Sequence, residues 1–190
     1  MDKKTIAIYG LGAIGSNLLS QLAKQYPDFE FHGIDFDKIE ERNIRTQAYF
    51  LEHIGLFKSD ALRIVLGRFI RRPNYRPFRM KIERPETIGQ ADLIIDCFDN
   101  TKSRELFKNV KGDVLHIGFS PEYSAECVWN ERYSVPGDVD PSKNDICSMT
   151  DAVGFIHFVV NAAVLNISSF LANGTKRDFL VTNKNKMVWL

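Results

Sequence analysis

Short apolar runs and apolar residues at helical spacing alternate along the first half of the chain. Runs rich in apolar residues occur at positions 5–9, 29–35 and 93–95. Between them, apolar residues recur every three or four positions over 18–26 and 61–70. Continuous runs are typical of buried strands, whereas the wider spacing is typical of amphipathic helices. This alternation predicts an α/β fold with a Rossmann-like, mostly parallel sheet and helices on both faces.

Further strands are predicted in the middle of the chain. Phe78, Met80 and Ile82 alternate with polar or charged residues and predict a third strand. Residues 114–117 form another apolar run, and residues 125–129 can pair beside it. These segments extend the predicted sheet beyond the run at positions 93–95.

The remaining elements are helices and a short carboxyl-terminal pair of strands. Asn100 or Thr101 can cap a helix that carries Leu106, Phe107 and Val110. The apolar segment 155–171 is short for a bilayer span and contains two asparagines, so it predicts a buried helix. Two β-prone runs at 179–182 and 187–190 predict a small antiparallel carboxyl-terminal extension.

Composition narrows the class of protein. The 190 residues fit a single domain spanning 1–190, and 25 Lys+Arg nearly balance 24 Asp+Glu. No overall field would recruit nucleic acid or an anionic membrane, so we expect neither partner. The arginine-rich stretch 68–79 has few aromatic residues for base stacking, which favours a solvated face.

The three cysteines indicate a reducing environment. Cys97, Cys127 and Cys147 are odd in number and include no C-x-x-C pair, so we expect a cytoplasmic protein without structural zinc. Cys97 and Cys127 fall in strand-like runs and are expected to be packed. His116 and His157 also fall in apolar segments, where a buried core histidine is expected.

A glycine-rich turn between the first strand and the first helix predicts a nucleotide site. The turn reads Gly10-Leu11-Gly12-Ala13-Ile14-Gly15. Such glycines allow a tight turn and close approach of backbone N–H groups, including those of Ala13 and Ile14, to phosphate at a helix N-terminus. Asp35 ends the second strand 20 residues after Gly15, where a carboxylate can accept ribose hydroxyls. ATP and NAD both present such a ribose, so the turn alone leaves both open.

Residues after the second strand resemble a known signature. Residues 35–47 read DFDKIEERNIRTQ, which resembles the D-x-D-x-V-x-x-x-N-x-x-R-Q pattern of the ThiF/MoeB/E1 superfamily of ubiquitin-like-protein activating enzymes. Gly55 and Lys58 resemble the family's G-x-x-K, and residues 96–104 resemble its D-x-x-D-N-x-x-x-R. Cys147 and Gly154 reproduce a C-x6-G spacing similar to the segment before the family's last helix.

This resemblance implies adenylation of the C-terminal carboxylate of a small ubiquitin-like (β-grasp) or sulfur-carrier protein by ATP and Mg²⁺. Like-charged reactants repel, so such chemistry needs cations and hydrogen-bond donors around the phosphates. The resemblance implies phosphate contacts from Lys58, Asn43 and Arg45, a Mg²⁺ ligand in Asp99 beside Asn100, ribose contacts from Asp35 and Asp37, and a covalent role for Cys147.

Each of these side chains also has a simpler interpretation. Outside the motif, Lys58 is a solvated lysine, Asp99 a helix cap with Asn100, Arg45 a surface charge and Cys147 a small buried residue. These alternatives remain open from the sequence.

The chain also departs from the family pattern. Thr46 stands where the family has arginine, and Arg45 stands one residue earlier. The family usually carries an arginine in a helical segment before the glycine strand, whereas residues 1–4 precede the strand here. A partner chain could supply that arginine, so we expect a homodimer or an E1-like heterodimer. Two functions remain as alternatives to adenylation: a non-catalytic ATP-binding E1-like subunit and a small NAD-dependent oxidoreductase.

Overall fold

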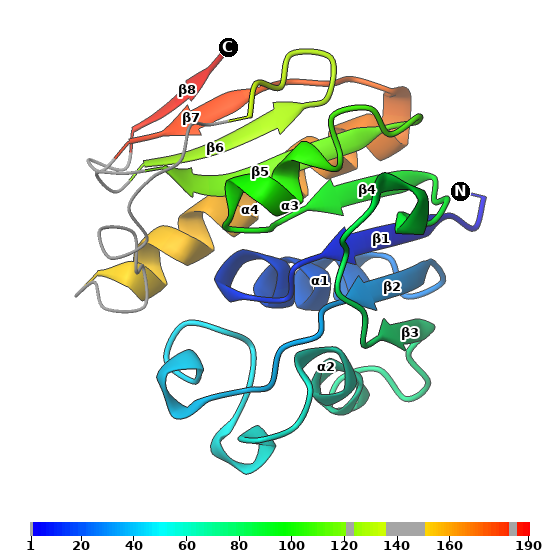
Figure 1. Ribbon diagram of the computed structural model, residues 1–190, viewed down its shortest axis with the longest axis vertical. Coiled ribbons are helices and arrows are strands. Elements are labelled where there is room, and N and C mark those ends of the chain that lie inside the picture. Colours follow the sequence, from blue (N-terminus) through cyan, green and yellow to red (C-terminus); the bar gives the residue numbers. More distant parts are fainter. Residues whose placement is uncertain (1, 121–123, 136–150, 183–185) are drawn as a thin grey trace.

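The protein forms one eight-stranded sheet in a computed structural model that describes residues 2–120, 124–135, 151–182 and 186–190. The strand order is β3-β2-β1-β4-β5-β6-β7-β8 (Figure 1). The strands are β1 (Thr5–Tyr9), β2 (Glu30–Ile34), β3 (Tyr75–Phe78), β4 (Leu93–Asp96), β5 (Val114–Ser120), β6 (Ser124–Trp129), β7 (Phe179–Val181) and β8 (Met187–Trp189). The first five strands in sequence are parallel, and β6, β7 and β8 pair antiparallel. The predicted mostly parallel sheet with an antiparallel extension is thus confirmed.

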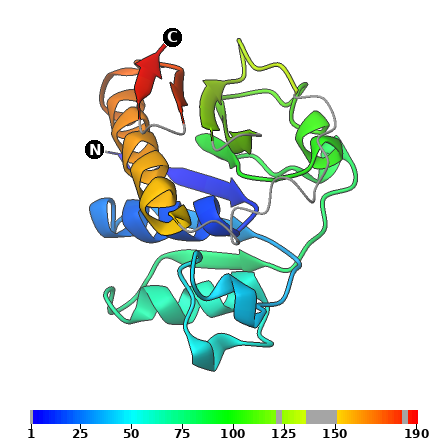
Figure 2. The same ribbon diagram turned by 90° about the vertical axis from the view of Figure 1, so that its left-hand side faces the viewer.

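Helices cover both faces of this sheet. They are α1 (Ala13–Gln25), α2 (Lys58–Gly67), α3 (Thr101–Glu105) and α4 (Ala152–Asn173). The first core cluster joins residues of α1, α2 and α4, whereas α3 lies on the opposite side of the sheet from α4 (Figure 2). Ile6 and Ile8 belong to that first cluster, while Ala7 and Tyr9 face the second one. Alternate residues of β1 therefore serve two separate hydrophobic layers, as expected of a strand covered on both faces.

The strand register brings the carboxyl ends of the parallel strands β1, β2 and β4 together. Tyr9, the last residue of β1, pairs with Ile34 of β2 and with Asp96 of β4. The chain reverses its direction of progress across the sheet between β1 and β4, because β2 and β3 lie on one side of β1 and β4 on the other. Ligands of open α/β sheets bind at this kind of switch point, beyond the carboxyl ends of the strands.

The predicted third strand was placed too late in the chain. The observed β3 ends at Phe78, where the carbonyl oxygen accepts a hydrogen bond from the N–H of Asp35, and the chain then leaves the sheet. Ile82 is buried and Met80 packs against the second core cluster from outside any strand. The alternation of apolar residues here reflects their burial against the sheet, and residues outside a strand can be buried in the same pattern.

The two remaining helices differ in part from their predictions. α3 is capped by Asn100, whose Oδ1 accepts from Ser103 N–H at 2.9 Å, but it ends at Glu105. α4 has 22 residues and is long enough to cross a membrane, so the prediction of a segment too short for a bilayer span was wrong. Its most apolar 18-residue window has mean hydropathy of 1.7, and 56% of that window is buried inside the protein, as predicted for a buried helix. His116 is fully buried as predicted, whereas the prediction of a buried His157 was wrong, because this side chain lies on the exposed side of α4.

Candidate functional site

The glycine turn joins β1 to α1 in a conformation that requires residues without a side chain at two positions. Gly10 has φ +84°, and a Cβ built there would lie 2.9 Å from the carbonyl oxygen of Cys97. A Cβ at Gly15 would lie 1.9 Å from the carbonyl oxygen of Gly10. These two glycines therefore let the turn close on itself and let β4 approach it, as their spacing predicts.

The middle glycine of the turn faces open space instead. Apart from its chain neighbours, a Cβ at Gly12 would meet no atom of the described residues within 4 Å. Gly12 caps α1, and the amide N–H groups of Gly12, Ala13 and Ile14 have no hydrogen-bond partner among the described residues. An open space in front of free N–H groups at a helix N-terminus is suited to bind an anion such as phosphate.

Asp35 ties the glycine turn to the segment after β2. Its Oδ2 accepts a hydrogen bond from Leu11 N–H at 2.7 Å, and its Oδ1 accepts one from Asp37 N–H at 2.7 Å. Burial raises the pKa of the Asp35 carboxyl above its ordinary value, and the charge of Lys58 partly opposes that rise. Each oxygen retains a lone pair, so the carboxylate can still accept a ribose hydroxyl.

Lys58 is held at the start of α2 by an ion pair. Its Nζ lies 3.0 Å from Oδ2 of Asp37, and its N–H donates to the Asp37 carbonyl oxygen at 2.9 Å. The lysine is 8% exposed. A positive charge at a helix N-terminus opposes the helix dipole, so α2 gains nothing from this lysine there. Burial of a cation at that position favours a role other than helix stability.

The segment between β2 and α2 lies against the first turns of α1. Asn17 Nδ2 donates to the Thr46 carbonyl oxygen at 2.9 Å, and Tyr49 Oη donates to the Leu11 carbonyl oxygen at 2.9 Å. The buried Asn43 accepts from Glu40 N–H through Oδ1 at 2.9 Å, which leaves its Nδ2 as a donor. These contacts bring the predicted phosphate-binding segment to the glycine turn.

Thr46 and Arg45 differ in exposure. Thr46, at the position of the family's arginine, is 4% exposed and packed against α1. Arg45 is exposed. Because Thr46 is buried and Arg45 is exposed, the two side chains point in different directions. An arginine at position 45 therefore does not point where an arginine at position 46 would.

Asp99 follows β4 on the other side of the glycine turn. Its carboxylate is exposed, and Asn100 Nδ2 lies 3.5 Å from its Oδ1. Within the described ranges, no cluster of three or more His, Cys, Asp or Glu could hold a metal. A single carboxylate beside a phosphate site nevertheless fits Mg²⁺, because this ion takes one or two carboxylates and completes its shell with phosphate oxygens and water.

The three cysteines have different outcomes. Cys147 lies outside the described residues, so its predicted covalent role stays a prediction. Cys127 is fully buried and Cys97 packs against the core, as predicted. Burial raises the pKa of the Cys97 thiol well above its ordinary value, and it raises the pKa of Cys127 as well. Neither thiol is therefore poised as a thiolate nucleophile.

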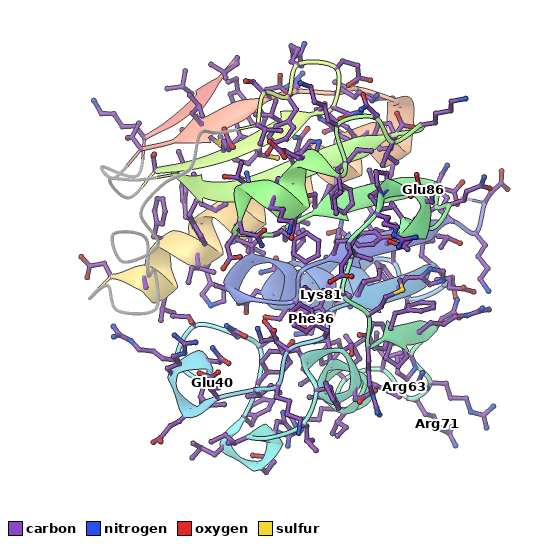
Figure 3. The ribbon with its side chains drawn as sticks, in the orientation of Figure 1. Phe36, Glu40, Arg63, Arg71, Lys81 and Glu86 are labelled. Carbon is purple, nitrogen blue, oxygen red and sulfur yellow. The ribbon has the colours of Figure 1, made fainter. Side chains whose placement is uncertain are left out.

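Two features of the site were missed from the sequence. Phe36, directly after Asp35, is 46% exposed, and Lys81 Nζ lies 5.9 Å from the centre of its ring (Figure 3). This exposed ring directly follows the ribose candidate in the chain and is a candidate apolar contact for the nucleotide, and its position after Asp35 was the available signal. Tyr49, which holds the Leu11 carbonyl, had no signal in the sequence because its partner is 38 residues away.

Comparisons with known proteins give a consistent result. Residues 1–183 match the ThiF family. Over 80 residues, or 40% of this chain and 16% of the relative, the chain is 30% identical to the "adenylyltransferase and sulfurtransferase uba4" of Aspergillus clavatus.

Solved structures share the fold at low sequence identity. MccB of E. coli with MccA-N7isoASN aligns with a TM-score of 0.76 at 14% identity, and MccB with ATP aligns with 0.75 at 13%. PaaA aligns with a TM-score of 0.69 at 18% identity. Each alignment covers 98% of this chain and 63% of the other protein, so the chain spans less than two thirds of these structures. At such identities the likeness establishes the fold.

Proposed function

Because this chain belongs to the ThiF family, we propose that it uses ATP to adenylate the C-terminal carboxylate of a small ubiquitin-like (β-grasp) or sulfur-carrier protein. The observation that carries this proposal is the open space at Gly12, faced by free helix N–H groups and bordered by the buried carboxylate of Asp35. ATP bound there would place its phosphates over the turn and its ribose beside Asp35.

The reaction joins two anions. A carboxylate oxygen of the protein substrate attacks the α-phosphorus, the bond from that phosphorus to the bridging oxygen breaks, and pyrophosphate leaves with the electron pair. Charge therefore develops on the phosphates in the transition state, and nearby cations and donors lower the barrier. When bound, Mg²⁺ would neutralise part of that charge through phosphate oxygens.

The chain's own residues supply the remaining requirements. Lys58, which pairs with Asp37 and whose charge acts on Asp35, would place a positive charge at the phosphates. Asn43 Nδ2 and Arg45 would donate to phosphate oxygens. Asp99 would hold Mg²⁺. The nearly dry environment of Lys58 strengthens its electrostatic contribution relative to a solvated lysine.

The names of relatives support the class of substrate. The relative from A. clavatus is named an adenylyltransferase and sulfurtransferase, and MccB has been crystallised with ATP and with N-formylated MccA. We propose a small protein or peptide with a free C-terminal carboxylate as the partner, bound by a homodimer or an E1-like heterodimer. The buried Thr46 in the family's arginine position favours one alternative, a subunit that binds ATP without completing adenylation.

Exchange of radioactive pyrophosphate into ATP tests the proposal. With Mg²⁺, ATP and a small β-grasp protein ending in Gly-Gly, the protein should catalyse exchange, because acyl-adenylate formation is reversible. ATP binding without exchange in the presence of a panel of such carriers would indicate the non-catalytic subunit. Preferential binding of NAD(H) over ATP would contradict the proposal and favour the oxidoreductase.

Replacement of Gly12 by alanine separates nucleotide binding from folding. The added Cβ meets no atom of the described residues within 4 Å apart from its chain neighbours, so we expect no steric clash. The backbone at φ −78° and ψ −147° lies outside the regions that alanine favours, so we expect the free energy of unfolding to fall by about 1 kcal/mol. The methyl group would enter the space assigned to phosphate, so ATP affinity should fall about tenfold or more, equivalent to about 1.4 kcal/mol. Isothermal titration calorimetry measures the affinity, and alanine at Gly154 is the control, because a Cβ there also lies more than 4 Å from the side chains and other backbone of the residues that the structure describes.

A further inference from the structure

A connected group of six polar side chains lies next to the Asp99 turn. They come from β4, α3, β5, β6 and the turn after β6, and they are Asp96, Arg104, His116, Glu126, Asn130 and Tyr133. Asp96 and His116 are completely buried, and Arg104 is 4% exposed. The roles proposed above use none of these six side chains.

Arg104 is the centre of this group. Its Nε donates to the Phe98 carbonyl oxygen at 2.6 Å, and its Nη2 donates to the Ile117 carbonyl oxygen at 3.2 Å. Its Nη1 lies 3.2 Å from both Glu126 Oε1 and Tyr133 Oη. A buried guanidinium is tolerated when it is paired with a carboxylate and well hydrogen-bonded, and Arg104 pairs with Glu126 and uses four of its five N–H donors.

The sheet is shaped to admit this guanidinium. A Cβ at Gly118 would lie 1.6 Å from Nη2 of Arg104. Gly118 pairs with Glu126 across the β5–β6 ladder. The glycine that makes room for the guanidinium of Arg104 and the carboxylate that pairs with it therefore lie opposite each other on neighbouring strands. The arginine is therefore held at a fixed place over the sheet face.

Phe98, the residue before Asp99, is anchored on both sides of its backbone. Its N–H donates to Asp96 Oδ1 at 3.0 Å, and its carbonyl oxygen accepts from Arg104. Asn100, the residue after Asp99, accepts from Ser103 N–H through its side chain. Asp99 thus lies between two anchored residues while its carboxylate remains exposed.

The two anchors of Phe98 are also connected to each other. Asp96 Oδ2 lies 2.9 Å from His116 Nδ1, and the His116 ring stacks on Tyr133 with 3.5 Å between ring centres. Tyr133 in turn contacts Arg104. The contacts form a closed ring that begins and ends at the Phe98 backbone.

From this geometry we infer that Arg104 and Glu126 are positioning residues, which fix the Asp99 carboxylate where it can hold the Mg²⁺ of bound ATP. The inference rests on the proposed function, because it takes Mg·ATP as the ligand. Glu126 balances the buried charge of Arg104. Loss of that carboxylate charge weakens the hold of Arg104 on Phe98 and loosens the turn that carries Asp99.

The test compares ATP binding with Mg²⁺ and with EDTA by isothermal titration calorimetry in the full chain. The ratio of the two affinities measures the gain due to the metal. Glu126→Gln should lower this gain about tenfold, the usual cost of losing a residue that orients a metal ligand, and Asp99→Asn, which removes the ligand itself, should lower it at least as much. Metal-free ATP affinity should change less than about twofold, which is under 0.5 kcal/mol.

A double variant distinguishes positioning from general structural damage. If Glu126 acts through Asp99, Glu126→Gln should lower the gain no further in the Asp99→Asn background, whereas independent effects would add. Glu131→Gln is the matched control, because Glu131 lies in the same turn as Asn130 and Tyr133 but its side chain pairs with Lys176. Tyr133→Phe, which removes one hydroxyl contact to Arg104, provides a second variant with a smaller expected loss in the same direction should Glu126→Gln fold poorly.

The outcomes separate this inference from the proposed function. A wild-type protein that binds no ATP would overturn both. ATP binding with a metal-dependent gain that survives Glu126→Gln and Tyr133→Phe, or additive losses in the double variant, would overturn the positioning role and leave the proposed function intact. ATP binding without any gain from Mg²⁺ would overturn the metal assignment on which the positioning role depends.

Discussion

Replacement of Lys58 by methionine is expected to slow pyrophosphate exchange about a hundredfold to a thousandfold, the usual effect of removing one group that stabilises transition-state charge. Methionine keeps the apolar stem of the side chain and removes the ammonium group. Loss of the ammonium group removes the ion-pair partner of Asp37, whose carboxylate is already half-exposed to solvent. It also removes an unfavourable interaction of a positive charge with the α2 dipole. The free energy of unfolding should therefore change by less than about 1 kcal/mol.

The combination of lost activity and retained stability is the informative result. Lys24→Met is the matched control, because Lys24 is an exposed lysine in the last turn of α1. Exchange rates that stay unchanged in Lys58→Met would remove this lysine from the mechanism. A parallel loss of stability and activity would assign Lys58 a structural role instead.

Replacement of Gly15 by alanine is expected to produce the largest loss of stability. The new Cβ would lie 1.9 Å from the carbonyl oxygen of Gly10, a backbone atom that cannot move without opening the turn. The free energy of unfolding should fall by about 3 kcal/mol, at the upper end of the range for overpacking. Urea denaturation monitored by circular dichroism measures this value.

A glycine in α2 provides the matched control for that prediction. Within the described part of the chain, nothing beyond its own helix neighbours lies within 4 Å of a Cβ built at Gly67, so Gly67→Ala should leave stability unchanged or raise it by up to about 1 kcal/mol. Equal stabilities of the Gly15→Ala and Gly67→Ala variants would show that the turn tolerates a side chain. The close packing of the turn would then carry no weight in the account of the site.

The sequence predicts elements well where one pattern has one structural explanation. β1, α1 and β4 lie where their apolar periodicity predicts, because each buries a regular face against the core. The third strand was misplaced because Met80 and Ile82 are buried outside any strand, and alternation does not distinguish these cases. Pairing with β2 decides where β3 ends, and such long-range pairing has no local signal.

The candidate site shows the same division. Spacing alone located Asp35 at the end of β2. Its hydrogen bond from Leu11 N–H, 24 residues away along the chain, depends on the tertiary fold and could not be predicted from spacing. The ring of contacts around Arg104 was not predictable, because Glu126 and Tyr133 lie 22 and 29 residues away along the chain. Side-chain contacts across the sheet require the strand order, which local patterns do not provide.

A crystal structure of the protein with Mg²⁺ and a non-hydrolysable ATP analogue tests the central claim most directly. We expect the triphosphate to lie over the turn at Gly12 and the ribose to contact Asp35, with Lys58 and Asp99 both reaching the phosphates. A triphosphate bound elsewhere on the protein would contradict the account, as would Lys58 and Asp99 lying out of reach of the same phosphates.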